Sequence, residues 1–252
     1  MKYDFETVLD RYDKGSVKWN LMKKMKPEVE RGVVPFSIAD MEFKNPPEII
    51  EALKEYLDTA VLGYQTAEPS WYEAVTSWTK RRYGWETRPE WFYTTPGVVN
   101  ALYHGVLAFT EKEDGVIIMP PVYHPFYRAV ETNGRKVVRC PLKEGRELSY
   151  TIDFDRLDTL AADPKNTLLI LCNPHNPIGR VWSREELLKI SQICLRHHVF
   201  VISDEIHCDL IMPGHVFTSF ASLSEENAAN TMTCIAPSKT FNLAGLEASC
   251  VI

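Results

Sequence analysis

Short apolar runs, separated by polar and turn residues, dominate the chain from residue 115 onward. Most of them are apolar at nearly every position, which is typical of parallel strands buried on both faces of a sheet. These runs span residues 116–119, 136–139, 168–172, 199–202 and 232–235. Between two of them, Ser183 precedes a stripe formed by Leu187, Ile190 and Ile193, which predicts an N-capped crossover helix. The alternation predicts an α/β fold with three layers and a mainly parallel sheet.

Helical patterns replace strand patterns nearer the start of the chain. A helix is predicted over residues 46–57, with apolar residues spaced so that one face should be buried: Ile49, Ile50, Leu53 and Leu57. A second helix is predicted from about Ser70, and its Trp71 and Trp78 are expected to pack in the core. Residues 1–45 show weak periodicity and are rich in charges and aromatics, which favours an arm packed on another domain or subunit. We therefore divide the chain into an arm, 1–45, and a large domain, 46–252.

Composition narrows the class of protein. The 252 residues are 45% hydrophobic, enough for a large core, and the net charge of -6 comes from interspersed signs without a basic stripe for nucleic acid. No apolar run approaches the roughly 20 residues of a membrane span, and the charged start resembles no signal peptide. We therefore expect a cytoplasmic protein. The six cysteines form no C-x-x-C pair, so we expect buried free thiols. No metal site is expected, because His197-His198 and His207-Cys208 lack the spacing of a ligand set.

Reactive side chains follow four of the predicted strands. Tyr123 follows the strand at 116–119, Asn176 the strand at 168–172, Asp204 the strand at 199–202, and Lys239 the strand at 232–235. Ligands of open α/β sheets bind at the carboxyl ends of the strands. A single lysine after a strand is usually a solvated loop residue, and a single tyrosine usually belongs to the core or surface. Their joint occurrence, in order and at one edge, favours a binding site.

The residue types indicate the chemistry of this site. An amine such as that of Lys239 can act as a Schiff-base nucleophile only when burial or nearby positive charge lowers its pKa. Asp204 would be costly to bury as an ion unless a cationic group pairs with it. Gly97 precedes a long helical pattern, whose free N–H groups could bind an anion such as a phosphate, although most such turns merely cap a helix.

The motifs that contain these residues resemble those of a known superfamily. Asn-Pro-His-Asn-Pro-Ile-Gly at 173–179, Ser-Asp-Glu-Ile-His at 203–207 and Ser-Lys-Thr at 238–240 resemble fold-type I enzymes of the class I/II aminotransferase superfamily, which depend on pyridoxal 5′-phosphate (PLP). Four further segments resemble its cystathionine β-lyase-like branch of C–S lyases: 16–19, 38–43, 63–64 and 239–246. The resemblance covers essentially the whole chain. It implies a PLP-transferase large domain, with the N-terminal arm belonging to a small domain.

The resemblance also implies roles around the PLP ring. Lys239 would hold PLP covalently and later move the substrate's Cα proton. Asp204 would pair with the ring nitrogen, and Asn176 would bind the phenolic oxygen. His207 stands where many aminotransferases have a tyrosine that serves the same oxygen. Tyr123 would stack on the ring.

At the phosphate end, the resemblance implies both local and partner contacts. The local phosphate ligands would be Gly97, Val98, Val99 and Ser238. Tyr64 would reach the phosphate of a neighbouring subunit, which implies a homodimer with shared active sites. Many relatives have a basic phosphate ligand eight residues after the lysine, whereas this chain has Glu247. Relatives continue for on the order of a hundred further residues. The rest of the small domain, with the arginine that binds the substrate carboxylate, is therefore expected to be missing, and poor solubility is expected at this length.

The function implied by the branch motifs is β-elimination. A cystathionine-like or cysteine-like amino acid would yield pyruvate, ammonia and a thiol. Transamination remains an alternative, because the PLP motifs serve it equally well. A non-enzymatic alternative, suggested by the chain length, is a truncated remnant or a regulator that acts through protein contacts.

Overall fold

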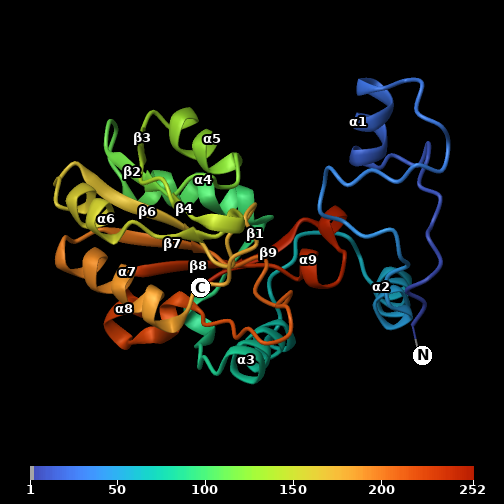
Figure 1. The fold of residues 1–252 in the computed structure, drawn as a ribbon. Helices are drawn as coiled ribbons and strands as arrows, with labels where there is room; N and C mark the ends of the chain where they lie inside the picture. Colours follow the sequence, from blue (N-terminus) through green and yellow to red (C-terminus); the bar gives the residue numbers. More distant parts are fainter. Residues whose placement is uncertain (1–2) are drawn as a thin grey trace.

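The computed structural model describes residues 3–252, and its main body is built on a seven-stranded sheet (Figure 1). The strand order is β1-β9-β8-β7-β6-β2-β3. The strands are β1 (Tyr93–Pro96), β2 (Gly115–Ile118), β3 (Lys136–Arg139), β6 (Asn166–Cys172), β7 (Phe200–Asp204), β8 (Thr231–Ile235) and β9 (Ala248–Val251). Five of them, β2, β3, β6, β7 and β8, pair in parallel, and β9 runs antiparallel to both of its neighbours. The five predicted strands are confirmed to within two residues at either end.

Helices cover both faces of this sheet. One face packs against α4 (Val98–Phe109) and α5 (Pro125–Thr132), through an apolar cluster that includes Leu102 and Phe126. The other face packs against α6 (Phe154–Ala161) and α7 (Arg184–Arg196). Shorter elements complete the body: the hairpin of β4 (Lys143–Glu144) and β5 (Tyr150–Thr151), then α8 (Glu225–Ala229) and α9 (Pro237–Thr240). The predicted three-layer α/β fold is confirmed.

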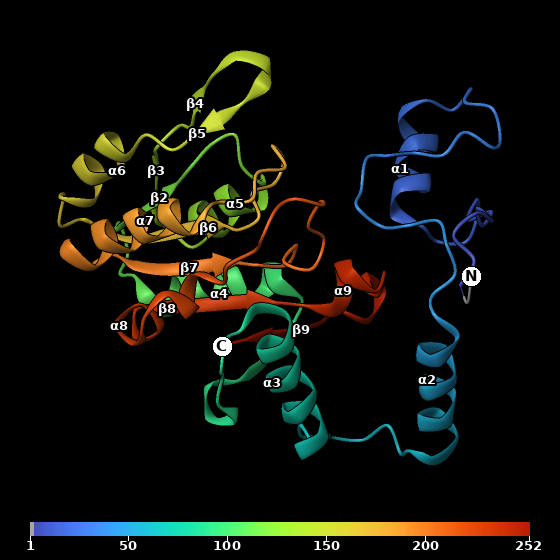
Figure 2. The same ribbon diagram turned by 60° about the horizontal axis from the view of Figure 1, so that its bottom comes forward.

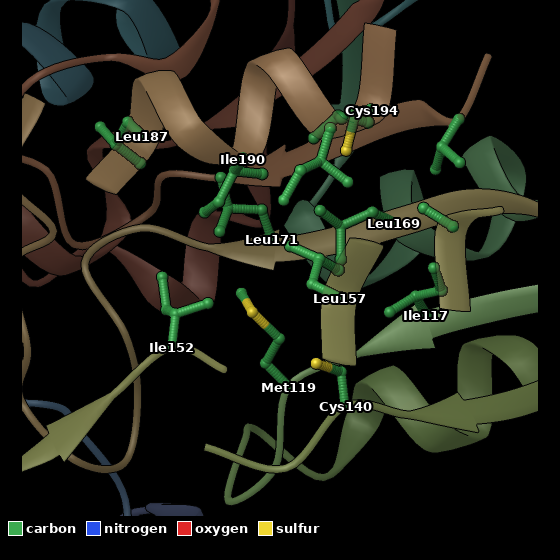
Figure 3. Close-up of a cluster of buried hydrophobic side chains, with 14 of the residues drawn as sticks. Ile117, Met119, Cys140, Ile152, Leu157, Leu169, Leu171, Leu187, Ile190 and Cys194 are labelled. Atoms are coloured by element: carbon green, nitrogen blue, oxygen red, sulfur yellow. The ribbon is translucent and has the colours of Figure 1, made fainter. Parts of the chain in front are cut away.

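The core beneath α7 shows why these elements assemble. Figure 3 shows Leu187 and Ile190 of α7 close to Leu171 of β6, within a cluster whose members are nearly all inaccessible to solvent. Each such side chain stabilises the fold by about 1.5–3 kcal/mol on burial. The helix begins at a capping box, in which Ser183 Oγ accepts from Glu186 N at 3.2 Å and Ser183 N donates to the Glu186 carboxylate at 2.8 Å. The predicted crossover helix is thereby confirmed.

Residues 3–60 lie beside this body rather than within its layers. Figures 1 and 2 both show α1 (Val17–Met25) and α2 (Pro47–Thr59) on the same side, beyond α9. Reciprocal hydrogen bonds between Met41 and Asn242, at 2.9 and 3.0 Å, connect this arm to the segment after α9. Asn45 adds two donations to backbone carbonyls there, both at 2.9 Å. The domain boundary at residue 45 stays a prediction.

Two expectations about helix burial need correction. α2 forms where predicted, but its apolar face is not buried: Ile50, Leu53 and Leu57 are exposed, and none of the residues of this helix is buried. α3 (Pro69–Tyr83) also forms, yet Trp71 and Trp78 are only half-buried and lie at its contacts with other elements rather than in a central core. Amphipathic spacing identifies an apolar face without identifying what covers it.

The structure also shows the state of the cysteines and the character of the helices. All six cysteines are buried and unpaired, as expected. Within residues 3–252, no helix combines the length and apolar character that a membrane crossing requires.

Candidate active site

A cavity of about 1400 Å³ opens where the parallel strands end at their carboxyl termini. Nine of the ten predicted site residues line it: Gly97, Val98, Val99, Tyr123, Asn176, Asp204, His207, Ser238 and Lys239. The tenth, Tyr64, is fully exposed in the segment after α2 and does not line this cavity. The strand-end pattern therefore leads to one shared site, and the individual roles of its residues stay predictions.

Lys239 reaches the cavity from α9, the single helical turn that follows β8. Its Nζ donates a 2.8 Å hydrogen bond to the carbonyl of Ala39, which belongs to the N-terminal arm. Burial lowers the pKa of the Lys239 amine, whereas the nearby Asp40 and Asp204 carboxylates oppose that change. A lowered pKa increases the fraction of neutral amine, which is the nucleophilic and proton-accepting form.

Asp204 is the last residue of β7 and is only 3% exposed. Its Oδ1 accepts a 3.2 Å hydrogen bond from Ile206 N, and within residues 3–252 it forms no salt bridge. Burial raises its pKa to about 7, although the Ile206 hydrogen bond and the charge of Lys239 lower it in part. This carboxyl group lacks a close cationic partner, and the space beside it is the cavity.

Asn176 lies in a tightly braced loop after β6. His175, just before it, donates its backbone N–H to Arg180 O at 2.7 Å, and its buried ring contacts Pro121 O at 3.0 Å. Burial lowers the pKa of His175 to about 4, so the ring is neutral and serves this loop. Trp182 closes the loop by donating to Cys172 O at 3.0 Å. In the part of the chain that the structure describes, the Asn176 side chain makes no hydrogen bond, so the braced loop around it holds it at the cavity.

Two aromatic rings complete the wall around these groups. Tyr123 is half-buried after β2, and burial raises the pKa of its hydroxyl, so it stays protonated at neutral pH. Burial, with a smaller contribution from the charge of Lys239, lowers the pKa of His207. The imidazole is therefore neutral at neutral pH and has one N–H donor and one acceptor nitrogen.

The amino end of α4 supplies a place for an anion. Gly97 adopts φ +85°, a conformation that L side chains rarely adopt, and directly precedes the first helical residue, Val98. A Cβ at Gly97 would meet no atom within 4 Å, so the space in front of the helix is open. The first N–H groups of a helix have no intrahelical acceptor and favour negative charge. This end of the cavity suits a phosphate group.

Sequence reasoning missed the ion cluster that holds the arm over the cavity. Lys18, almost fully buried, pairs with Asp40 at 2.8 Å and with Glu42, while Arg11 pairs with the same two carboxylates at 3.0 and 3.3 Å. Trp19 Nε1 donates to Glu42 at 3.2 Å. The cluster fixes the segment that presents the Ala39 carbonyl to Lys239. Lys18, Asp40 and Glu42 of this cluster lie in the branch motifs at 16–19 and 38–43, so the sequence contained them, but the motifs did not indicate that these charges pair with one another.

The sequence is similar to those of known protein families and enzymes. Residues 31–251 match the family model described as aminotransferase class I and II. Over 249 residues the chain is 49% identical to cystathionine beta-lyase PatB of Bacillus subtilis (strain 168), covering 99% of this chain and 64% of that protein. It is 29% identical to protein MalY of Escherichia coli (strain K12), covering 97% of this chain and 61% of that protein.

The fold is also similar to those of solved PLP-containing structures. Cystalysin from Treponema denticola, whose crystal structure contains a pyridoxal 5′-phosphate cofactor, superimposes with a TM-score of 0.98 at 49% identity, covering 100% of this chain and 64% of that chain. The PLP-bound C–S lyase from Staphylococcus hominis gives a TM-score of 0.90 at 35% identity, covering 99% and 63%. The chain thus spans a little under two thirds of the length of these relatives. It belongs to the aminotransferase class I and II family.

Proposed function

We propose that this protein is a PLP-dependent carbon–sulfur lyase. It would cleave cystathionine or a cysteine-like amino acid, with addition of water, into pyruvate, ammonia and a thiol. The observation that carries the proposal is the placement of Lys239 and Asp204 in one cavity, with pKa values shifted in opposite directions by burial. The similarity to a cystathionine beta-lyase and to C–S lyases supports the choice of reaction.

The residues of the cavity fit PLP. The cofactor has a basic ring nitrogen, an aldehyde and a phosphate, and the cavity offers a matching group for each. Asp204 provides a buried acid without a cationic partner in the described chain, Lys239 an amine of lowered pKa, and Gly97 the open end of a helix. When bound, PLP supplies an electron sink for negative charge that develops at the substrate Cα.

The chain's own groups would then act as follows. Asp204, as the carboxylate, would keep the ring nitrogen protonated, while Asn176 and the neutral His207 would hydrogen-bond the phenolic oxygen. Tyr123 would stack against the ring and limit its tilt. Lys239, as the neutral amine, would take the proton from the substrate Cα, and the thiolate would leave from Cβ.

The phosphate would be held where α4 begins. The backbone amides after Gly97, with the hydroxyl of Ser238, would donate to its oxygens. We further propose a homodimer in which Tyr64 of one subunit reaches the phosphate site of the other. Support comes from the full exposure of Tyr64 and from the exposed apolar face of the preceding helix, which includes Leu53 and Leu57. A cytoplasmic location is proposed from the six unpaired cysteines.

The test measures cofactor binding and product separately. Wild-type protein titrated with PLP should develop a near-visible band and release pyruvate from cystathionine, detected with lactate dehydrogenase. Lys239→Ala should lose both, whereas Lys189→Ala, on the exposed side of α7, should lose neither. A wild-type protein that binds PLP and converts a 2-oxo acid into an amino acid, without forming pyruvate from cystathionine, would be an aminotransferase.

A further inference from the structure

Asp209, five residues beyond Asp204, is at the centre of a hydrogen-bond network outside the cavity. Its side chain is 7% exposed and does not line the cavity. Four donors converge on its two oxygens: Trp78 Nε1 at 3.2 Å, Arg82 Nε at 3.2 Å, Tyr83 OH at 2.6 Å and Thr240 Oγ1 at 2.8 Å. Three of these donors belong to α3, and the fourth belongs to α9.

The contact with Thr240 matters because Thr240 is the residue next to Lys239. Both belong to α9, a turn of four residues. Isolated helices shorter than about 12 residues are marginal in water, so this turn depends on tertiary contacts for its position. Asp209 provides one such contact, and the edge-on packing of Trp78 against Phe241, with centroids 5.6 Å apart, provides another from the same helix.

The network requires an acceptor at its centre. The indole of Trp78 and the guanidinium of Arg82 can only donate. Burial, reinforced by the nearby Cys208 and Asp209, raises the pKa of Tyr83 above its usual value, which keeps its hydroxyl protonated as a donor. A carboxylate can satisfy all four donors, whereas an amide has one oxygen and presents an NH₂ group to the remaining donors.

We propose that Asp209 is a positioning residue for Lys239. It fixes α9 against α3 through Thr240 and so holds the lysine amine in the cavity. The inference rests on the proposed function, because it assigns Asp209 a role in the cofactor attachment made by Lys239. It adds a residue that does not line the cavity.

Four variants test this role: Asp209→Asn, Thr240→Val, Thr240→Ser and the double variant Asp209→Asn/Thr240→Val. Asp158→Asn is the matched control, because this acid accepts from Arg196 and His197 at the surface between α6 and α7. The first measurement is the dissociation constant of PLP, from the near-visible band. The second is the pH midpoint of Lys239 acylation in cofactor-free protein, followed by mass spectrometry. Thermal unfolding of the same samples shows whether each variant folds.

Asp209→Asn and Thr240→Val should each weaken PLP binding about tenfold to a hundredfold, the effect of losing one hydrogen bond to a charged group. Both should raise the midpoint of Lys239 acylation, because a displaced amine is better hydrated. Thr240→Ser, which keeps the hydroxyl, should keep the PLP dissociation constant within about threefold of wild type and leave the acylation midpoint unchanged. The double variant should bind PLP no more weakly than the weaker-binding single variant.

Several outcomes would overturn the proposal. Folded Asp209→Asn and Thr240→Val proteins that match wild type in PLP affinity and acylation midpoint would show that the network does not act on Lys239. A Thr240→Ser protein as weak as Thr240→Val would exclude the hydroxyl as the connection. A wild-type protein that binds no PLP would refute the proposed function itself, and this inference with it, whereas normal wild-type binding with unaffected variants would refute the inference alone.

Discussion

Replacing Asp204 with asparagine should stabilise the cofactor-free protein, and the gain should grow with pH. Asp204 is a carboxyl group buried without a cationic partner in the described chain, so its ionisation opposes folding until a cation binds beside it. Asparagine has nearly the same shape and cannot ionise. The substitution therefore removes the cost of the charge while keeping the packing.

The magnitude follows from the pKa of Asp204, which burial raises from 3.8 to about 7. Because the folded-state pKa is the higher one, the folded protein binds the proton more tightly. The contribution of Asp204 to stability is therefore greatest below about pH 4, falls as the pH rises to about 7, and is constant above that. One pKa unit corresponds to about 1.4 kcal/mol, so the full penalty is about 4 kcal/mol. Roughly 3 kcal/mol of it develops between about pH 5 and about pH 8.

The assay is urea unfolding of cofactor-free wild type and Asp204→Asn, followed by circular dichroism at about pH 5 and about pH 8. The neighbouring Glu205 also has its pKa raised by burial to about 7, and it is present in both proteins, so its contribution largely cancels in the difference. Asp158→Asn controls for the loss of a surface carboxylate. An equal change in unfolding free energy at both pH values, or a variant less stable than wild type at the higher pH, would refute the reasoning. The same variant should lose PLP affinity.

Two further predictions concern charges near the cavity. Lys18→Met should destabilise the protein by about 2–3 kcal/mol, because the buried Glu42 and the partly exposed Asp40 then keep only Arg11 of their two cations. Thermal unfolding compares this loss with that of Lys23→Met, whose ion pair is more exposed, and an equally small loss in both variants would contradict it. Glu247→Gln should tighten PLP binding about threefold to tenfold, since Glu247 and Gly97 both line the cavity and are the sequence neighbours of Ala248 and Pro96, which pair across β9 and β1. The tightening should shrink in high salt, and an unchanged dissociation constant at low salt would show that this carboxylate does not act on the phosphate.

Four of the parallel strands, β2, β6, β7 and β8, were predictable because burial on both faces leaves a local record, a run that is apolar at nearly every position. The fifth, β3, lies at the edge of the sheet and has exposed charged residues at both ends, so it is not buried on both faces as expected. β6 and β7 show this record clearly, and the reactive residues after them could be assigned to one edge by topology alone. β9 leaves no such record: its four residues take their place from pairing with β1 and β8. Asp209 was missed for a related reason. Three of its hydrogen-bond donors come from a helix some 130 residues earlier, and the sequence around Asp209 does not predict that contact.

The exposed face of α2 and the buried charges of the arm both show that local sequence does not determine burial. Leu53 and Leu57 follow the helical pattern and yet lie open, whereas Lys18 and Glu42 break the usual preference of charges for solvent and yet are buried. The first case depends on what packs against the helix, and the second on a set of opposite charges brought together from segments about twenty residues apart. Neither is a property of the local sequence.

The cavity holds an acid and an amine that burial drives toward their neutral forms, Asp204 by raising its pKa and Lys239 by lowering its pKa. For Lys239 the neutral form is the one that attacks an aldehyde, so burial prepares it for reaction. For Asp204 the neutral form cannot hold a pyridine nitrogen in its protonated state, so burial alone works against it, and only a cation placed beside it restores the charge. The same burial thus makes one residue ready before the cofactor arrives and makes the other depend on the cofactor. Asp204 therefore lowers the stability of the cofactor-free protein, and binding of the protonated ring nitrogen beside it would offset that loss.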